Sequence, residues 1–184
     1  MRAFFAVPLP ADVHDAVARG TGELRRRLGS ARWVRSEGVH ITMRFLGEQT
    51  ADLLSRLADE VESRLRAALP VEVALQGGGF FPHERRPRVA WLGGSAPGME
   101  LWAEAIERCA GALGIDPEPR PFSLHVTLAR LDRPWGAGDV ETFLTAVGKW
   151  RLAPFVGREV VLFKSELLPS GAAYTPLRRF QVGG

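Results

Sequence analysis

Two short stretches far apart in the chain carry nearly the same sequence. His40–Met43 reads His-Ile-Thr-Met, and His125–Leu128 reads His-Val-Thr-Leu. In a β-strand, side chains alternate between the two faces, so each stretch presents His and Thr to one surface and its apolar residues to the core. Two such copies indicate an internal duplication. A pseudo-two-fold axis between the copies would bring their polar faces together across a cleft.

The rest of the chain is typical of an α+β fold. Apolar residues at helical spacing predict four helices, which begin near Val13, Thr50, Met99 and Asp139, with Thr50 as an N-cap. Strand-like segments lie between them: Ala3–Val7, Val39–Leu46, Val71–Leu75, Val89–Leu92, Leu124–Ala129, Val160–Leu167 and Tyr174–Val182. The glycine-rich stretches 76–79 and 93–98 are predicted to be loops. No long linker divides the chain, so we expect residues 1–184 to form one domain with two pseudo-symmetric lobes, one motif in each.

Composition restricts the function classes. Hydrophobic residues make up 46% of the 184 residues, and no apolar run reaches the roughly 18 residues of a membrane span. The apolar start of the chain is too brief for a signal peptide, so we expect a cytoplasmic protein with no membrane partner. Cys109 is the single cysteine and is expected in the core, which excludes an internal disulfide and a cysteine zinc cluster. The net charge of +3 permits a nucleic-acid partner without requiring one.

Paired histidines suit the opening of a cyclic phosphodiester. An imidazole has an ordinary pKa near 6.5, so one ring can be neutral while another is protonated at the same pH. The neutral ring takes a proton from water, and the protonated ring donates one to the departing oxygen. The hydroxyls of Thr42 and Thr127 would donate hydrogen bonds to the non-bridging phosphate oxygens. This chemistry requires no metal or cofactor, and we expect neither.

These residues carry a family resemblance. The chain resembles the two-histidine (2H) phosphoesterase superfamily and, within it, the bacterial and archaeal RNA 2′,3′-cyclic phosphodiesterases, long called 2′-5′ RNA ligases. The likeness covers nearly the whole chain and is carried by Arg2–Pro10, Trp33-Val34, His40–Glu48, Pro87–Gly93, Phe122–Arg130 and Leu162–Tyr174. Two departures are Leu124, where the family usually has proline, and Arg35-Ser36, where it often has prolines.

The resemblance implies a bilobal fold in which two mainly antiparallel sheets flank a central cleft with helices outside. It also implies that His40 is the proton donor to the 3′ oxygen and that His125 is the proton acceptor for water. Thr42 and Thr127 would bind the phosphate. Arg130 would meet phosphate or the RNA end, although strict alternation puts it on the face opposite His125 unless the strand bends or ends first.

Alternation also makes predictions for the residues after Thr42. Arg44 shares the face of Thr42, which makes it a second candidate for substrate binding. Phe45 would then lie on the opposite face, in the core.

The function expected from these observations is hydrolysis of a terminal RNA 2′,3′-cyclic phosphate to a 2′-phosphate by a monomer. The same site could run in reverse and join RNA ends as a 2′-5′ linkage without ATP. Two alternatives stay open. The same chemistry could act on a small cyclic nucleotide, an ADP-ribose cyclic phosphate or a 2′,5′-oligonucleotide, or the chain could be a non-catalytic RNA-binding protein.

Overall fold

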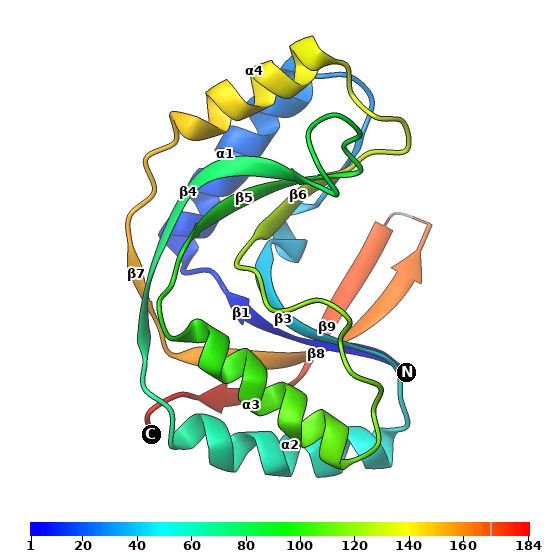
Figure 1. Cartoon of the computed structure of the whole chain (residues 1–184), viewed down its shortest axis with the longest axis vertical. Coiled ribbons are helices and arrows are strands. Elements are labelled where there is room, and N and C mark those ends of the chain that lie inside the picture. The colour runs from blue at the N-terminus through cyan, green and yellow to red at the C-terminus, as the bar shows by residue number, and fades with distance from the viewer. Residues whose placement is uncertain (170) are drawn as a thin grey trace.

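The computed structural model describes residues 1–169 and 171–184, which contain four α-helices, one 3-10 helix and nine strands (Figure 1). The helices are α1 (Ala11–Arg27), α2 (Ala51–Arg66), α3 (Met99–Ala112) and α4 (Ala137–Gly148), with the 3-10 helix η1 at Ser36–Gly38. The strands are β1 (Arg2–Pro8), β2 (Arg32–Trp33), β3 (His40–Glu48), β4 (Val71–Phe81), β5 (Val89–Ser95), β6 (Val126–Arg130), β7 (Phe155–Gly157), β8 (Glu159–Leu168) and β9 (Gly171–Gln181).

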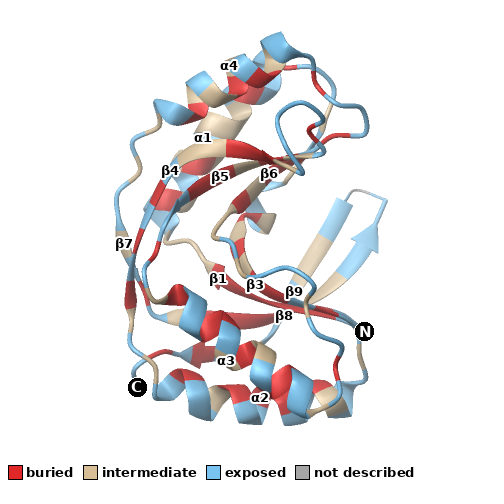
Figure 2. Cartoon of the chain, viewed as in Figure 1, coloured by how far each residue is buried: buried red, intermediate tan, exposed pale blue. Residues whose placement is uncertain are grey.

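All four predicted helices are present, and their amphipathic patterns explain their positions. The N-cap prediction is confirmed, because the Thr50 hydroxyl accepts a hydrogen bond of 3.2 Å from the Leu53 amide. Figure 2 shows α2 and α3 with alternating buried and exposed residues, as expected for helices that bury one face. Within the described residues, none of the helices has the length and apolar character required to cross a lipid bilayer.

The strands form one strongly curled antiparallel sheet in the order β7-β4-β5-β6-β3-β1-β8-β9, with β2 paired to β6. Four strands lie on each side of its centre: β3, β1, β8 and β9 make one half, and β6, β5, β4 and β7 make the other. The halves join through the single pair Ile41–Val126. The α+β fold class is therefore confirmed, and the two sheets expected from the family resemblance are continuous at this pair.

The helices cross between the halves of the sheet. The helix α1 follows β1 in the chain but lies beside α4 on the half that contains β4, β5 and β6 (Figure 1). The helix α3 connects β5 to β6 but packs against α2 and β3 on the opposite half. Because each half is covered in part by a helix from the other, one hydrophobic cluster runs through both.

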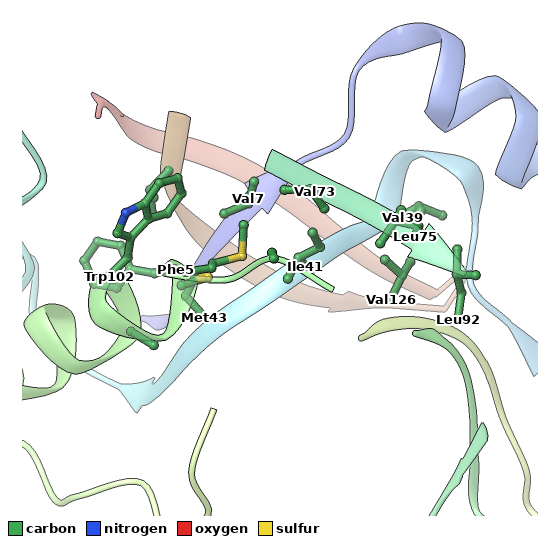
Figure 3. Close-up of a cluster of buried hydrophobic side chains, with 14 of the residues drawn as sticks. Phe5, Val7, Val39, Ile41, Met43, Val73, Leu75, Leu92, Trp102 and Val126 are labelled. Atoms are coloured by element: carbon green, nitrogen blue, oxygen red, sulfur yellow. The ribbon is translucent and has the colours of Figure 1, made fainter. Parts of the chain in front are cut away.

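The centre of this cluster lies behind the two motif strands. Figure 3 shows Ile41, Met43 and Val126 pointing into it, beside Phe5 of β1 and Trp102 of α3. Ile41 and Val126 are completely buried. The apolar residues of each motif therefore anchor the motif strands to the core, as the alternation predicted.

The prediction of a loop at residues 76–79 is wrong, because β4 runs continuously through them. Gly79 lies opposite Trp91 of β5, and a Cβ atom at Gly79 would lie 2.3 Å from the Trp91 ring. A Cβ at Gly78 would likewise lie 3.0 Å from Phe143 of α4. These glycines leave room for aromatic rings on a strand, which composition alone cannot distinguish from a loop.

Candidate active site

The two repeated motifs meet at the centre of the sheet, where β3 and β6 pair in antiparallel orientation. Ile41 lies opposite Val126, and both side chains point into the core. The residues before and after each of them therefore point to the other face. Four polar side chains share that face and line a cleft of about 1080 Å³: His40, Thr42, His125 and Thr127.

Aromatic rings surround His40 in its half of the cleft. Phe4 of β1 stacks on the imidazole with ring centroids 4.9 Å apart, and Tyr174 of β9 meets the ring edge-on at 5.4 Å. Burial disfavours the charged ring and lowers the pKa of His40 to about 4. The positive charges of His125 and Arg130 act in the same direction. His40 is therefore neutral near pH 7 in the ligand-free protein.

His125 is oriented by a backbone carbonyl. Its Nδ1 lies 2.8 Å from the Ser123 oxygen, and an Nδ1–H donated to this oxygen leaves the Nε2 lone pair free to accept a proton. Phe81 meets the ring edge-on at 4.9 Å. Burial lowers the pKa of His125, and the charges of Arg120 and Arg130 lower it further.

The two histidines have matching backbone partners. The His40 ring forms a hydrogen bond to the backbone of Gly38, two residues earlier, as the His125 ring does to Ser123. Each bond raises the pKa of its histidine, but by less than burial lowers it. The similarity of the two motifs therefore extends from their sequence to the backbone partner of each ring.

A β-bulge follows each motif at the same position. The strand pairings skip one residue after each threonine, which makes Met43 the extra residue in β3 and Leu128 the extra residue in β6. Such a bulge reverses the alternation of faces beyond it. The third residue after each threonine therefore turns to the cleft: Phe45 in β3 and Arg130 in β6.

The bulges decide three expectations that depended on strict alternation. Arg130 reaches the cleft, because the bulge supplies the bend in the strand that this position requires. The prediction that Phe45 lies in the core is wrong, since its side chain is 48% exposed. Arg44 pairs with the core residue Phe5 and so turns away from the face of Thr42, although it still borders the same cleft. Arg44 is only 6% exposed, and its guanidinium is bonded to Glu107 of α3.

Several cleft residues were not identified from the sequence. Arg120 lines the cleft from the connection between α3 and β6, and Phe4, Phe81 and Tyr174 do so from β1, β4 and β9. Arg120 lies among prolines, in a segment with no strand alternation that could assign a face. The aromatic residues come from strands that are distant in sequence, so only the sheet order brings them to the histidines.

The cleft contains groups suited to binding an anion and moving protons. Two imidazoles, two hydroxyls and the guanidiniums of Arg120 and Arg130 face one space. Within the described residues, no group of three or more His, Cys, Asp or Glu side chains lies close enough together to hold a metal ion. The arrangement places two imidazoles, which can exchange protons, beside hydroxyl and guanidinium hydrogen-bond donors.

Comparison with known proteins agrees with this arrangement. A family model described as LigT-like phosphoesterase matches residues 7–91 and 94–174. The RNA 2′,3′-cyclic phosphodiesterase of Thermus thermophilus is 33% identical over 192 residues, which cover 100% of this chain and 91% of that protein. The protein of the same name from Methanothermobacter thermautotrophicus is 29% identical over 185 residues, 99% of either chain.

Solved structures share the fold over the full length of the chain. TT0787 of Thermus thermophilus has a TM-score of 0.81 at 30% identity, with coverage of 100% of this chain and 99% of that one. E. coli LigT complexed with 3′-AMP has a TM-score of 0.76 at 25% identity, with coverage of 100% and 98%. The family match spans both motifs and most of the sheet. The chain therefore belongs to the LigT-like phosphoesterase family.

Proposed function

We propose that this protein hydrolyses the 2′,3′-cyclic phosphate at the end of an RNA and leaves a 2′-phosphate. The observation that carries the proposal is the placement of two His-Thr pairs on one face of the central strands, lining one cleft. The names of the relatives from Thermus and Methanothermobacter support the same substrate. E. coli LigT complexed with 3′-AMP supports a cleft that accepts a ribonucleotide.

The proposed reaction is one displacement at phosphorus. Nε2 of His125 takes a proton from water, and the water oxygen forms a bond to phosphorus. The bond from phosphorus to the ribose 3′ oxygen breaks, and the His40 imidazolium donates a proton to that oxygen. The product carries a 2′-phosphate and a free 3′-hydroxyl.

The remaining polar groups act on the phosphate. The hydroxyls of Thr42 and Thr127 donate hydrogen bonds to the non-bridging oxygens, where negative charge increases as the new bond forms. The Arg130 guanidinium faces the same space and balances that charge. Arg44 is not included in this set, because protein groups already bond its guanidinium.

The low pKa of His40 requires that the acid be charged by its substrate. In the ligand-free protein the ring is neutral at pH 7, and an anion beside it would favour the imidazolium. We propose that the cyclic phosphate supplies this charge. Proton uptake by His40 would then accompany substrate binding.

The reverse reaction uses the same groups. A 5′-hydroxyl in place of water would give a 2′-5′ linkage from a 2′,3′-cyclic end without ATP, although bulk water favours hydrolysis. We also propose that the protein acts as a single-domain cytoplasmic monomer without metal or cofactor. Turnover in the presence of EDTA and sedimentation of the active species test the metal and monomer parts of this proposal.

The test of the function uses an RNA oligonucleotide with a 2′,3′-cyclic phosphate end, with EDTA present. The parent protein should yield a 2′-phosphate, identified by mass and by its resistance to a 3′-phosphatase. A 2′,3′-cyclic mononucleotide, run in parallel, separates an RNA enzyme from one that acts on small cyclic phosphates. Absence of turnover on every cyclic phosphate would favour the RNA-binding alternative.

The mechanism is tested by His40→Ala and His125→Ala. Each should lower the rate by about a hundredfold or more, because acid and base act in the same step, and the losses should not add in the double variant. His83→Ala is the matched control, because His83 lies exposed in the connection between β4 and β5. A folded variant at His40 or His125 that retains one third of the parent rate would exclude the two-histidine mechanism.

A further inference from the structure

Arg44 is the one buried charged side chain among the described residues. Its Nε donates to the Glu107 carboxylate on α3, and its Nη1 donates to the Phe45 carbonyl. Its Nη2 donates to the Asp116 carbonyl, on the segment after α3. The planar guanidinium thus connects β3 to the C-terminal part of α3 and to the chain beyond it.

Glu107 makes a second contact to the same segment. Its Oε1 accepts a hydrogen bond of 3.1 Å from the Glu118 amide, while its other oxygen is bonded to Arg44. The Glu118 carboxylate lies 3.7 Å from Arg44 Nη1. Arg44 and Glu107, here called the clamp, therefore hold both Asp116 and Glu118.

The segment held by the clamp has little regular structure of its own. Residues 115–125 are neither helix nor strand. Pro117, Pro119 and Pro121 have no amide hydrogen and cannot donate backbone hydrogen bonds. Side-chain contacts such as those of the clamp must therefore fix much of its conformation.

This segment carries two groups that act on His125. The Ser123 carbonyl lies 2.8 Å from His125 Nδ1, and Arg120 lines the cleft near the ring. Displacement of the segment would release the ring from its carbonyl partner and move the Arg120 charge. The position of the proposed base therefore depends on a contact made by the other motif strand.

We propose that Arg44 and Glu107 are positioning residues that set the orientation of His125 through residues 116–123. Arg44 itself does not touch the substrate in this proposal. The kinetic part rests on the proposed function, whereas the structural part does not. The two parts need separate measurements.

The structural part is tested by NMR of the histidine rings, which needs no turnover. The chain has four histidines, so two-bond ¹⁵N–¹H spectra can resolve the tautomer and titration of each ring. In Arg44→Lys, the ammonium cannot reproduce three directed bonds from one plane. We expect His125 to lose its single Nδ1–H tautomer. Its pKa should rise toward 6.5, because exposure of the ring outweighs the loss of the Ser123 hydrogen bond.

The charged and titratable groups that face His125 are His40, Arg120 and Arg130. Arg120 and Arg130 lower the pKa of His125, and the charge of His125 in turn lowers the pKa of His40. Glu107→Ala is the second variant, because it removes the bonds of Glu107 to Arg44 and to the Glu118 amide, at a residue that is one third exposed. It keeps the test open if Arg44→Lys does not fold. Arg178→Lys is the matched control, since Arg178 also joins two carboxylates, Asp59 and Glu62, away from the cleft.

The kinetic part is tested on the cyclic-phosphate RNA. We expect Arg44→Lys and Glu107→Ala to lower kcat by about tenfold or more with little change in KM, because a misplaced base slows the reaction of bound substrate. In both variants, the part of the pH–rate profile that reports the titration of His125 should shift. Arg178→Lys should keep the kcat and the pH–rate profile of the parent protein. If the clamp had a purely structural role, the variants would be less stable but would keep the parent kcat and pH–rate profile.

Each failure has a distinct signature. If the folded clamp variants keep the parent tautomer and titration of His125, the positioning proposal is overturned, whatever their activity. If the parent protein does not open cyclic phosphates, the proposed function fails. The NMR result would still decide whether the clamp orients His125.

Discussion

Binding of phosphate should charge His40, and the size of this effect follows from the structure. Burial lowers the pKa of His40 from 6.5 to about 4 in the ligand-free protein. At 1.36 kcal/mol per pKa unit, the charged ring is disfavoured by about 3 kcal/mol. At pH 7 only about one molecule in a thousand would hold the proton that the proposed acid must donate.

An anion in the cleft should offset this penalty. A negative charge about 4 Å from the ring contributes about 4 kcal/mol at an effective dielectric constant of 20, which corresponds to about three pKa units. The pKa of His40 should therefore rise to near 7 when phosphate binds. The proposed acid would then be substantially protonated only in the complex.

The assay is a ¹⁵N titration of the His40 ring between pH 4 and 8, with and without inorganic phosphate. His40→Ala assigns the resonance, and chloride at equal ionic strength controls for screening. The free ring should titrate below pH 5, and the bound ring at least two units higher. A free His40 that titrates near 6.5, or one that phosphate leaves unchanged, would refute this account of how the acid is charged.

Three further predictions concern single perturbations. Thr42→Ala and Thr127→Ala should each lower kcat by about tenfold to a hundredfold, less than loss of either histidine, because one hydrogen bond to charged phosphate is removed; Thr→Ser at the same positions should retain most of the rate. Acid should destabilise the protein: the unfolded chain takes up a proton at His40 below pH 6.5 and the folded protein only below about pH 4, so the free energy of unfolding in urea should fall as the pH drops through that window. The His40 contribution to this fall should be about 2–3 kcal/mol at pH 4.5 and absent in His40→Gln, whereas stability that rises with acid would contradict the buried neutral ring. Gly94→Ala should lower the free energy of unfolding by about 1–3 kcal/mol in thermal melts, because the new Cβ would lie 2.3 Å from the Ala74 carbonyl oxygen across the β4–β5 pair. Gly22→Ala should instead raise it by about 0.5–1 kcal/mol, because nothing lies within 4 Å of the new Cβ on α1.

Local patterns predicted the parts of the fold that depend on neighbouring residues. The helix α2 was predicted from its apolar stripe and the Thr50 cap, because both arise within one or two helical turns. The strands β1 and β8 were predicted because buried strands carry short apolar runs. The strand β4 was wrongly ended before its glycines, since their small size serves the rings of Trp91 and Phe143 on other elements.

In the site, as in the fold, some features follow from local sequence and others do not. The sequence by itself determined that His40, Thr42, His125 and Thr127 present their side chains opposite the core, because alternation along a strand needs no information from elsewhere. Their meeting in one cleft was expected from the duplication. In the structure, Ile41 pairs with Val126, so the two motifs lie side by side on neighbouring strands.

Only the tertiary structure decided what lies beside those four residues. The bulges at Met43 and Leu128 depend on how β1 and β5 pair with the motif strands, and they turn Phe45 and Arg130 to the cleft and bury Arg44. The rings of Phe4 and Tyr174, which help lower the pKa of His40 through burial, come from opposite ends of the chain. The physical reason is range: alternation and helical periodicity act over a few residues, whereas bulges, burial and charge depend on contacts between segments that only the folded sheet brings together.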